Sequence, residues 1–324
     1  MNEFVQNRHI EFETPAKVIF DLVKRATSQE PVRRAKIVRG YENEVYSVET
    51  RQQAAYIVKI RRFGQVAFQQ EAWAMERCRE AGAPVSEVLL VDTIQSGGKS
   101  FDAMVQRSAF GQPLSDILWK LKRSALDKVL HQVGEILGCI HNVQVEGFGR
   151  RQAEGKWDFS TWESIMASAL QNISLEKEHI LQAGFSEREF EFMMEMLQKY
   201  PDEFPCHRPV LCHGDIEPDH IFIGENLKVS GIIDFGQFQG GPPILDFSHL
   251  SFVQPELNLE PIKNGYPDRE LIQDRFNRRL HLQRLGFLMG CVAYTVMMGD
   301  ENVDKTPDAS GQLKKTLEAL RRWI

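Results

Sequence analysis

Two short stretches of this sequence place acidic and histidine side chains between apolar residues. The first, LCHGDIEPDHIFI (211–223), contains two histidines and three acidic residues. The second, GIIDFG (231–236), contains Asp234 at the end of an apolar run. Carboxylate and imidazole groups bind metal ions and transfer protons. The pattern therefore indicates either a metal site or a turn whose polar side chains take part in chemistry.

The spacing of these residues favours phosphoryl transfer. Asp215 and His220 are five residues apart, and Asp234 follows Asp215 by nineteen residues. Protein kinases use this layout for a catalytic aspartate, an asparagine that binds metal and the aspartate of the D-F-G motif. One carboxylate orients a hydroxyl while another holds the magnesium ion that bridges the β- and γ-phosphates, so the two roles need different residues. We therefore predict Asp215 as the catalytic residue, and His220 and Asp234 as metal-binding residues.

A lysine and a glutamate upstream complete the expected phosphate-binding set. In the segment YIVKI, Lys59 is expected on a β-strand with its apolar neighbours on the opposite face. The helix that follows offers two glutamates as partners. Glu71 lies on its apolar side, whereas Glu76 shares its side with other charged residues. We therefore predict a Lys59–Glu71 pair that positions the α- and β-phosphates of a nucleotide.

Together these motifs resemble the aminoglycoside phosphotransferase and choline-kinase-like family of small-molecule kinases. HGDIEPDH (213–220) is similar to the family's H-G-D-x-x-P-x-N loop, and VKI and IIDFG also match. ILDFSHL has Asp246 where the family has a further structural aspartate, and GFG (147–149) precedes a tryptophan-containing helix. The resemblance implies an α+β, two-lobed, protein-kinase-like fold. Its small lobe would hold an antiparallel β-sheet with one main helix, and its larger lobe would be mostly helical.

The sequence departs from the family's pattern in two places. The family's asparagine is His220 here, and imidazole is a softer ligand than the oxygen atoms that magnesium prefers. His220 is therefore expected either to bind the metal, directly or through water, or to hydrogen-bond the loop. The segment RGYENEVYSV (39–48) has one glycine where a protein kinase has G-x-G-x-x-G. Its backbone, at Gly40 and Asn43, is expected to reach the nucleotide phosphates.

The resemblance also implies where a nucleotide base would bind. In MVQRSAF (104–110), the backbone of Gln106 and Ser108 is expected to bind adenine, with Met104 behind it. The expected cofactors are ATP and Mg²⁺. His213 is expected to support the catalytic loop rather than to act in catalysis.

The expected secondary structure divides the chain into two lobes. A leading helix comes first, and residues 36–105 alternate strand-like segments rich in β-branched and aromatic residues with one helix. Beyond Gly111 the apolar residues follow a helical period. We predict a nucleotide-binding lobe over residues 1–107 and a helical lobe, with the catalytic loop and the substrate site, over residues 108–324.

The composition is typical of an ordinary globular protein. The formal net charge of −6 argues against a nucleic-acid partner, which needs a basic surface to neutralise phosphates. The longest apolar stretch (285–298) is too short to span a bilayer core about 30 Å thick, and the first residues lack a signal-peptide pattern. The five cysteines are odd in number and widely spread, which indicates reduced thiols. We expect a cytoplasmic protein without a membrane partner, and the oligomeric state is left open.

The predicted reaction is ATP-dependent transfer of a γ-phosphoryl group to a hydroxyl of a small molecule. The resemblance favours an aminoglycoside-type antibiotic, and acidic residues of the C-terminal half would suit such a cationic substrate, although a solvated acidic face explains them equally well. These residues are Glu256, Glu260, Asp268, Glu270 and Asp274. Two alternatives stay open. One is a metabolite kinase for choline, an amino alcohol or a sugar, and the other is a catalytically inactive, pseudokinase-like nucleotide-binding protein.

Overall fold

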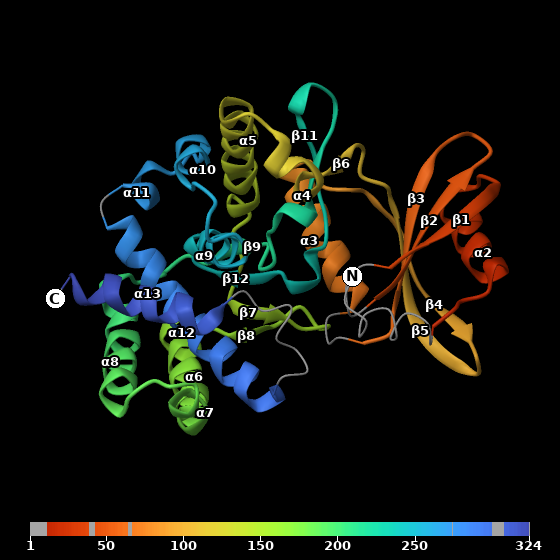
Figure 1. Cartoon of the computed structure of the whole chain (residues 1–324). Helices are drawn as coiled ribbons and strands as arrows, with labels where there is room; N and C mark the ends of the chain where they lie inside the picture. Colours follow the sequence, from red (N-terminus) through yellow and green to blue (C-terminus); the bar gives the residue numbers. More distant parts are fainter. Residues whose placement is uncertain (1–11, 39–42, 64–66, 274, 300–307, 324) are drawn as a thin grey trace. The chain divides into compact units, whose positions relative to one another are not determined.

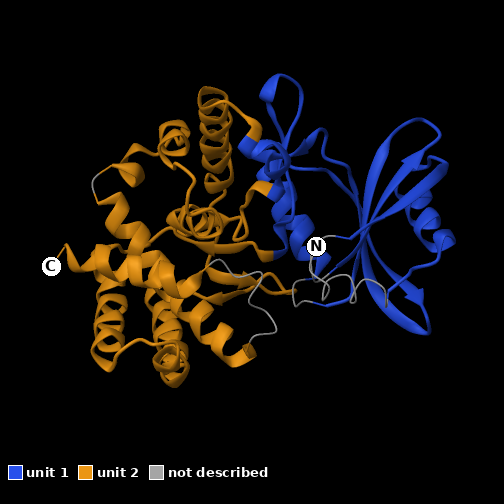
Figure 2. Ribbon diagram, viewed as in Figure 1, with its two compact units in different colours: residues 1–119, 219–236 blue, residues 120–218, 237–324 orange. Residues whose placement is uncertain are grey.

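The structure is a computed structural model that describes residues 12–38, 43–63, 67–273, 275–299 and 308–323. The chain divides into two compact units, coloured separately in Figure 2. Unit 1 comprises residues 1–119 and 219–236, and unit 2 comprises residues 120–218 and 237–324.

Unit 1 is built on a five-stranded sheet. Its strands are β1 (Pro31–Ile37), β2 (Asn43–Thr50), β3 (Ala55–Arg61), β4 (Val88–Ser96) and β5 (Lys99–Arg107). They lie in the order β1-β2-β3-β5-β4, and every neighbouring pair is antiparallel. Buried and less buried side chains alternate along β2 because successive residues of a strand point to opposite faces. The predicted antiparallel sheet is confirmed.

Two helices cover opposite faces of this sheet (Figure 1). Helix α2 (Ala16–Thr27) shares an apolar core with Val58 and Ile60 of β3. Helix α3 (Phe68–Glu80) lies on the other face, where its Glu71 contacts Lys59, the residue between Val58 and Ile60 in β3. The alternation of β3 therefore separates an apolar face under α2 from a face that presents a charged side chain to α3.

A small sheet joins a distant segment of the chain to unit 1. Its strands are β6 (Gln112–Pro113), β10 (Ile221–Ile223) and β11 (Val229–Ile232), in the order β11-β10-β6. The N–H of Ile232 donates to Pro84 O at 2.8 Å, which ties β11 to the segment after α3. The units thus differ from the predicted division at 107/108, because backbone pairing brings residues 219–236 to unit 1.

Unit 2 is mainly helical, as predicted. Its helices are α5 (Arg123–His141), α6 (Trp162–Leu175), α7 (Lys177–Gln182), α8 (Glu187–Glu203), α9 (Ile244–Val253), α10 (Glu260–Gly265), α11 (Arg269–Ile272), α12 (Phe276–Met298) and α13 (Ala309–Arg321). Its strands β7 (Phe148–Arg151), β8 (Trp157–Phe159), β9 (Val210–Cys212) and β12 (Gln239–Gly241) form a sheet in the order β8-β7-β12-β9. Helix α12 lies at the centre of the apolar core, where Leu285, Leu288 and Met289 are fully buried.

The remaining short elements are α4 (Leu114–Ile117) and the 3-10 turns η1 (Leu118–Lys120), η2 (Pro218–His220), η3 (Glu225–Leu227) and η4 (Phe235–Gln237). Within the described ranges, no helix has both the length and the apolar character that a membrane crossing requires.

Helices α5 and α10 pack backbone against backbone and lie side by side in Figure 1. A Cβ atom added at Gly134 of α5 would lie 2.0 Å from Ile262 O, and one at Gly265 of α10 would lie 1.9 Å from His131 O. Only glycine permits such an approach. The contact fixes the start of the segment after α10, which begins with Tyr266.

We expect Gly134→Ala to lower the free energy of unfolding by about 1–3 kcal/mol, because the added methyl group forces α5 and α10 apart. Gly290→Ala, on α12, is the matched control because its Cβ would meet no heavy atom of the described neighbouring chain within 4 Å. This control should gain about 0.5–1 kcal/mol from the better helix propensity of alanine. Urea unfolding followed by circular dichroism measures both, and equal midpoints would contradict the close contact.

Candidate functional site

Lys59 lies between two carboxylates in unit 1. Its Nζ atom is 2.7 Å from Glu71 Oε1 and 3.1 Å from Asp234 Oδ1. The side chains of Lys59 and Glu71 are buried, whereas that of Asp234 is 40% exposed. Burial alone would lower the pKa of Lys59, but the negative charges of Asp234 and Glu71 outweigh it and hold that pKa above its ordinary value. The structure therefore places the predicted Lys59–Glu71 pair in direct contact and keeps the lysine charged.

The two predicted metal-binding residues also lie together in unit 1. Asp234 Oδ2 is 3.8 Å from His220 Nε2, a separation longer than a hydrogen bond. The carbonyl of His220 accepts the N–H of Ile233 at 3.0 Å, which fixes the backbone of one beside the other. Asp234 has a φ angle of 68°, a left-handed conformation that costs a non-glycine residue about 1–3 kcal/mol. Strain of this kind is typical of residues whose side chain must point in one functional direction.

The predicted base-binding residues share the face of the sheet that carries Lys59. On β5, Met104 pairs with Lys59 and Gln106 pairs with Ile57, and directly opposite residues of antiparallel strands point to the same side. Gln106 is only 2% exposed, and its Oε1 atom has no hydrogen-bond partner among the described residues. Because buried acceptors are nearly always paired, this oxygen is suited to accept from a bound ligand.

Three further residues of the predicted nucleotide site have different outcomes. The backbone N–H of Ser108 donates to Ala55 O at 3.1 Å, so this amide already serves the sheet and the predicted adenine contact would fall to the carbonyl. Asn43 begins β2 opposite Arg61 and is partly exposed. Gly40 lies outside the described residues.

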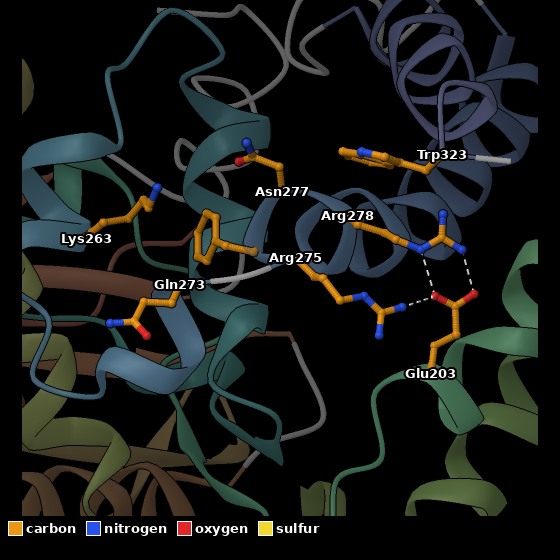
Figure 3. Close-up of a pocket in the computed structure, with 8 residues that line it drawn as sticks. Glu203, Lys263, Gln273, Arg275, Asn277, Arg278 and Trp323 are labelled. Atoms are coloured by element: carbon orange, nitrogen blue, oxygen red, sulfur yellow. Dashed lines mark hydrogen bonds and ion pairs between the residues drawn. The ribbon is translucent and has the colours of Figure 1, made fainter.

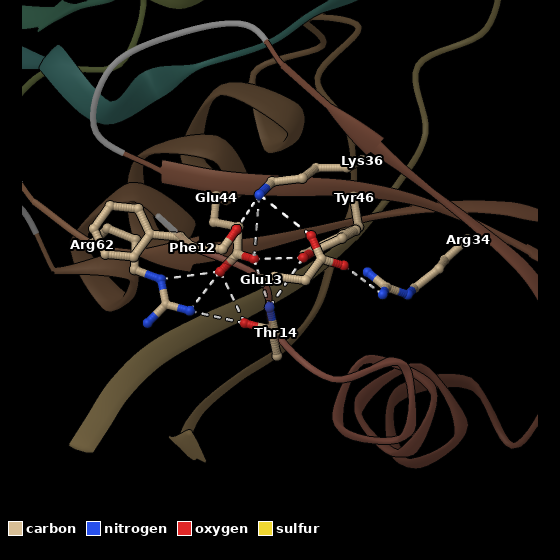
Figure 4. A network of polar contacts seen from close by, with 8 residues as sticks. All are labelled: Phe12, Glu13, Thr14, Arg34, Lys36, Glu44, Tyr46 and Arg62. Atoms are coloured by element: carbon tan, nitrogen blue, oxygen red, sulfur yellow. Dashed lines mark hydrogen bonds and ion pairs between the residues drawn. The ribbon is translucent and has the colours of Figure 1, made fainter. Parts of the chain in front are cut away.

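Next to Asn43 is a buried polar network that the sequence analysis missed (Figure 4). The side chain of Glu44 is fully buried and accepts from the backbone N–H and the hydroxyl of Thr14, both at 2.8 Å, and from Arg62 Nη2 at 2.6 Å. Tyr46 also donates its hydroxyl to Glu44. Burial would raise the pKa of Glu44, but these hydrogen bonds hold it below its ordinary value. The network anchors Thr14, which precedes Pro15 and helix α2, to Glu44 near the start of β2.

The alternation of β2 contained a signal for this network. Glu44 occupies the same face as Tyr46 and Val48, both of which are apolar-core positions. A glutamate on that face must find partners when it is buried, because an unpaired buried carboxylate is strongly destabilising.

In unit 2, Asp215 lies in a tight loop after β9. The preceding Gly214 has a φ of +79°, and a Cβ atom there would lie 2.1 Å from Gln237 O. The backbone N–H of Asp215 donates to Nδ1 of the fully buried His213 at 3.2 Å. The loop therefore needs glycine at one position, and His213 makes the supporting contact that the sequence predicted.

The backbone of this loop is held by Asp246 of α9. Its carboxylate accepts the N–H groups of His213 and Gly214, both at 2.8 Å, and its Oδ2 lies 3.0 Å from His141 Nε2. The other ring nitrogen of His141 is 2.9 Å from the hydroxyl of Tyr266. Burial would raise the pKa of Asp246, but the hydrogen bond and charge of His141, with His213 and the Gly214 amide, hold it below its ordinary value. Asp246 is therefore a buried, ionised support for the loop.

His141, Cys212 and Asp246 also have the composition of a metal site, since their ligand atoms lie within 4.8 Å of one another and all three are buried. Both oxygens of Asp246 and both nitrogens of His141 already have hydrogen-bond partners. A metal ion would have to displace these contacts, so we assign the cluster to structure.

A histidine that the sequence analysis did not single out lies beside Asp215. His249 Nε2 is 3.1 Å from Asp215 Oδ1. His249 follows Asp246 by three residues on α9, so helical spacing from that residue was the signal available in the sequence.

Unit 2 also contains a pocket of about 580 Å³, shown in Figure 3. It is lined by Glu203, Lys263, Gln273, Arg275, Phe276, Asn277, Arg278 and Trp323. Glu203 binds Arg278 at 2.6 Å and Arg275 at 2.9 Å, so its negative charge is neutralised. The described lining is basic and offers little to a cationic substrate.

Two of the acidic residues considered for a cationic substrate have structural partners. Glu260 binds Lys263 at 2.7 Å, and Asp268 caps α11 by accepting the N–H groups of Glu270 and Leu271. Asp274 lies outside the described residues.

Comparison with known proteins gives one family and a set of similar structures. The model of the phosphotransferase enzyme family matches residues 34–274. No curated protein matches the chain by sequence.

Among solved structures, a thermostable mutant of aminoglycoside phosphotransferase APH(4)-Ia has a TM-score of 0.70 at 18% identity, covering 93% of this chain and 98% of that chain. The ternary complex of a mutant of that enzyme with AMP-PNP and hygromycin B has a TM-score of 0.67 at 17% identity, covering 94% and 98%. Choline kinase LicA from Streptococcus pneumoniae has a TM-score of 0.59 at 17% identity, covering 94% and 98%. The predicted α+β, protein-kinase-like fold is confirmed.

We expect Asp246→Asn to lower the free energy of unfolding by about 2–3 kcal/mol, because the amide cannot accept both loop N–H groups and bond His141 as the carboxylate does. Asp268→Asn is the matched control, since asparagine and aspartate cap a helix equally well and the change should stay within about 0.5 kcal/mol. Urea denaturation measures both variants. Equal losses would show that the Asp246 network contributes no more than an exposed cap.

Proposed function

This chain belongs to the phosphotransferase enzyme family, and we propose that it is an ATP-dependent kinase that transfers the γ-phosphoryl group to a hydroxyl of a small molecule. The observation that carries this proposal is the buried Lys59 between Glu71 and Asp234. A lysine held charged by a helix glutamate and by the D-F-G aspartate is the arrangement that positions nucleotide phosphates in kinases.

Gln106 supports ATP as the phosphate donor. Its Oε1 atom is buried, has no hydrogen-bond partner among the described residues, and lies on the face of the sheet that carries Lys59. The amino group of adenine could donate the hydrogen bond that this oxygen does not receive from the described residues. In this proposal Met104 packs behind the base, and the backbone near Asn43 lies toward the phosphates.

The donor set of unit 1 fits Mg²⁺ through Asp234. Its carboxylate is more exposed than that of Glu71 and offers the hard oxygen ligand that magnesium prefers. His220 fits this ion less well than an amide oxygen would, so we assign it as a weak ligand of the ion, direct or through water. When bound, Mg²⁺ would neutralise charge on the phosphates.

Asp215 is assigned to the substrate hydroxyl. Its loop is fixed by Asp246 and His213, so the carboxylate sits on a rigid support. A carboxylate in this position orients the hydroxyl and accepts its proton as the oxygen bonds to phosphorus. Lys59, held by Glu71, would meanwhile keep the α- and β-phosphates in place.

For the acceptor we propose an aminoglycoside-type antibiotic first, and an amino alcohol such as choline second. The complex of APH(4)-Ia with AMP-PNP and hygromycin B supports the first, and the similarity to choline kinase LicA supports the second. A pseudokinase-like protein would keep the phosphate-binding residues but would not turn over ATP.

We expect Asp215→Asn to lower kcat by about 10²–10⁴-fold, because the amide cannot accept the hydroxyl proton. ADP formation would be measured with Mg·ATP and a panel of aminoglycosides, choline and sugars. Asp202→Asn, at an exposed position of α8, is the matched control and should keep full activity. Nucleotide binding, followed as a thermal shift with Mg·AMP-PNP, should be unchanged in both. Wild-type protein that binds nucleotide but turns over no panel compound would favour the pseudokinase-like alternative.

We expect His220→Asn to lower the Mg²⁺ concentration for half-maximal activity by roughly 3- to 10-fold, because an amide oxygen is a harder ligand than imidazole. The preference for Mn²⁺ over Mg²⁺ should fall in the same variant, since Mn²⁺, a transition-metal ion, tolerates a nitrogen ligand better than Mg²⁺ does. Titration of ADP formation with each ion measures both quantities, with the exposed His207→Asn as the control. An unchanged Mn²⁺ to Mg²⁺ ratio would exclude His220 from the metal site.

A further inference from the structure

His249 is a partly buried residue whose Nε2 atom lies close to the carboxylate of Asp215. Its side chain is 14% exposed, and its Nε2 atom lies 3.1 Å from Asp215 Oδ1. Nε2 is itself buried and has no well-aligned hydrogen bond within the described part of the chain, although the carboxylate oxygen of Asp215 lies within hydrogen-bonding distance of it. A buried ring nitrogen needs a partner, and the Asp215 carboxylate is at the right distance to be one.

Helix α9 links this contact to the support of the loop backbone. Asp246, one helical turn before His249, binds the N–H groups of His213 and Gly214. Residues three apart lie on the same side of a helix. One rigid element therefore holds the backbone before Asp215 and also faces its side chain.

The His249 ring also packs against Phe287 of α12. Its centroid lies 6.0 Å from that of Phe287, with the rings inclined at 61°. Phe287 in turn packs edge-on against Phe252 of α9 at 4.9 Å. Edge-to-face packing of this kind restricts the orientation of a ring. His249 is therefore placed by α9 and kept in place by α12.

From this arrangement we propose that His249 is a positioning residue that fixes the orientation of the Asp215 carboxylate, an inference that rests on the proposed function. The hydroxyl proton passes to Asp215, the hydroxyl oxygen bonds to the γ-phosphorus, and the bond from that phosphorus to the bridging oxygen of ADP breaks. His249 exchanges no atom in this step. Its Nε2–H restrains rotation of the carboxylate, and such catalytic contacts are often poorly aligned before substrate binds and tighten in the complex.

The test compares His249→Phe, which keeps the ring and removes both nitrogens, with His249→Gln, whose amide can still donate. His249→Phe should lower kcat for ADP formation by about 10- to 100-fold with KM for ATP changed less than about 3-fold, since misorientation costs catalysis rather than nucleotide binding. His249→Gln should recover at least about 5-fold of that loss. The exposed His207→Gln is the control for the substitution itself. A kcat within 2-fold of wild type in His249→Phe would overturn the proposal.

A second measurement is independent of turnover. In protein labelled with ¹⁵N-histidine, Asp215→Asn should shift the Nε2 resonance of His249 and leave that of His207 unchanged. No shift would overturn the contact even if the enzyme is active. If wild-type protein turns over no ATP, the proposed function fails, and a shifted His249 resonance would still establish the pair while removing its catalytic role.

Discussion

The buried carboxylate of Asp246 is the constraint on which the loop before Asp215 in unit 2 depends. A charged group with no exposure is tolerated only when it is fully hydrogen-bonded. Here the loop N–H groups of His213 and Gly214 and the ring of His141 meet that need. The same contacts that satisfy the charge therefore fix the loop at His213 and Gly214. Asp215 is the next residue in the sequence. In the proposed function, the hydrogen bonds that stabilise the loop would also hold Asp215 in place for catalysis.

The remaining structure of unit 2 serves this support. Glycines at the α5–α10 contact let the two backbones touch, and the segment after α10 brings Tyr266 to the second nitrogen of His141. That hydrogen bond fixes which nitrogen of the imidazole faces Asp246. The packing of α5 against α10 therefore affects the loop through the contacts of Tyr266, His141 and Asp246.

Unit 1 also contains a buried charge, which here is the positive charge of Lys59 rather than a carboxylate. Lys59 is buried, and a buried ammonium group would lose its proton without nearby negative charge. Glu71 and Asp234 supply that charge, while Asp234 stays partly exposed. A nucleotide phosphate would therefore meet a lysine that is already oriented and charged. The Glu44 network fixes the start of β2 by the same rule, since a buried charge is held by several partners.

Local sequence patterns were enough to predict the candidate site residues that are close together in the chain. Asp215, His220 and Asp234 are close to one another in the sequence, so their spacing alone predicted them. The alternation of β3 puts Lys59 on the other face of the strand from its apolar neighbours, and this too can be read from the sequence. The contact of His249 with Asp215 and the membership of residues 219–236 in unit 1 could not be predicted in this way. These depend on how helices pack and how distant strands pair, and local periodicity carries no information on which distant backbone a segment will meet.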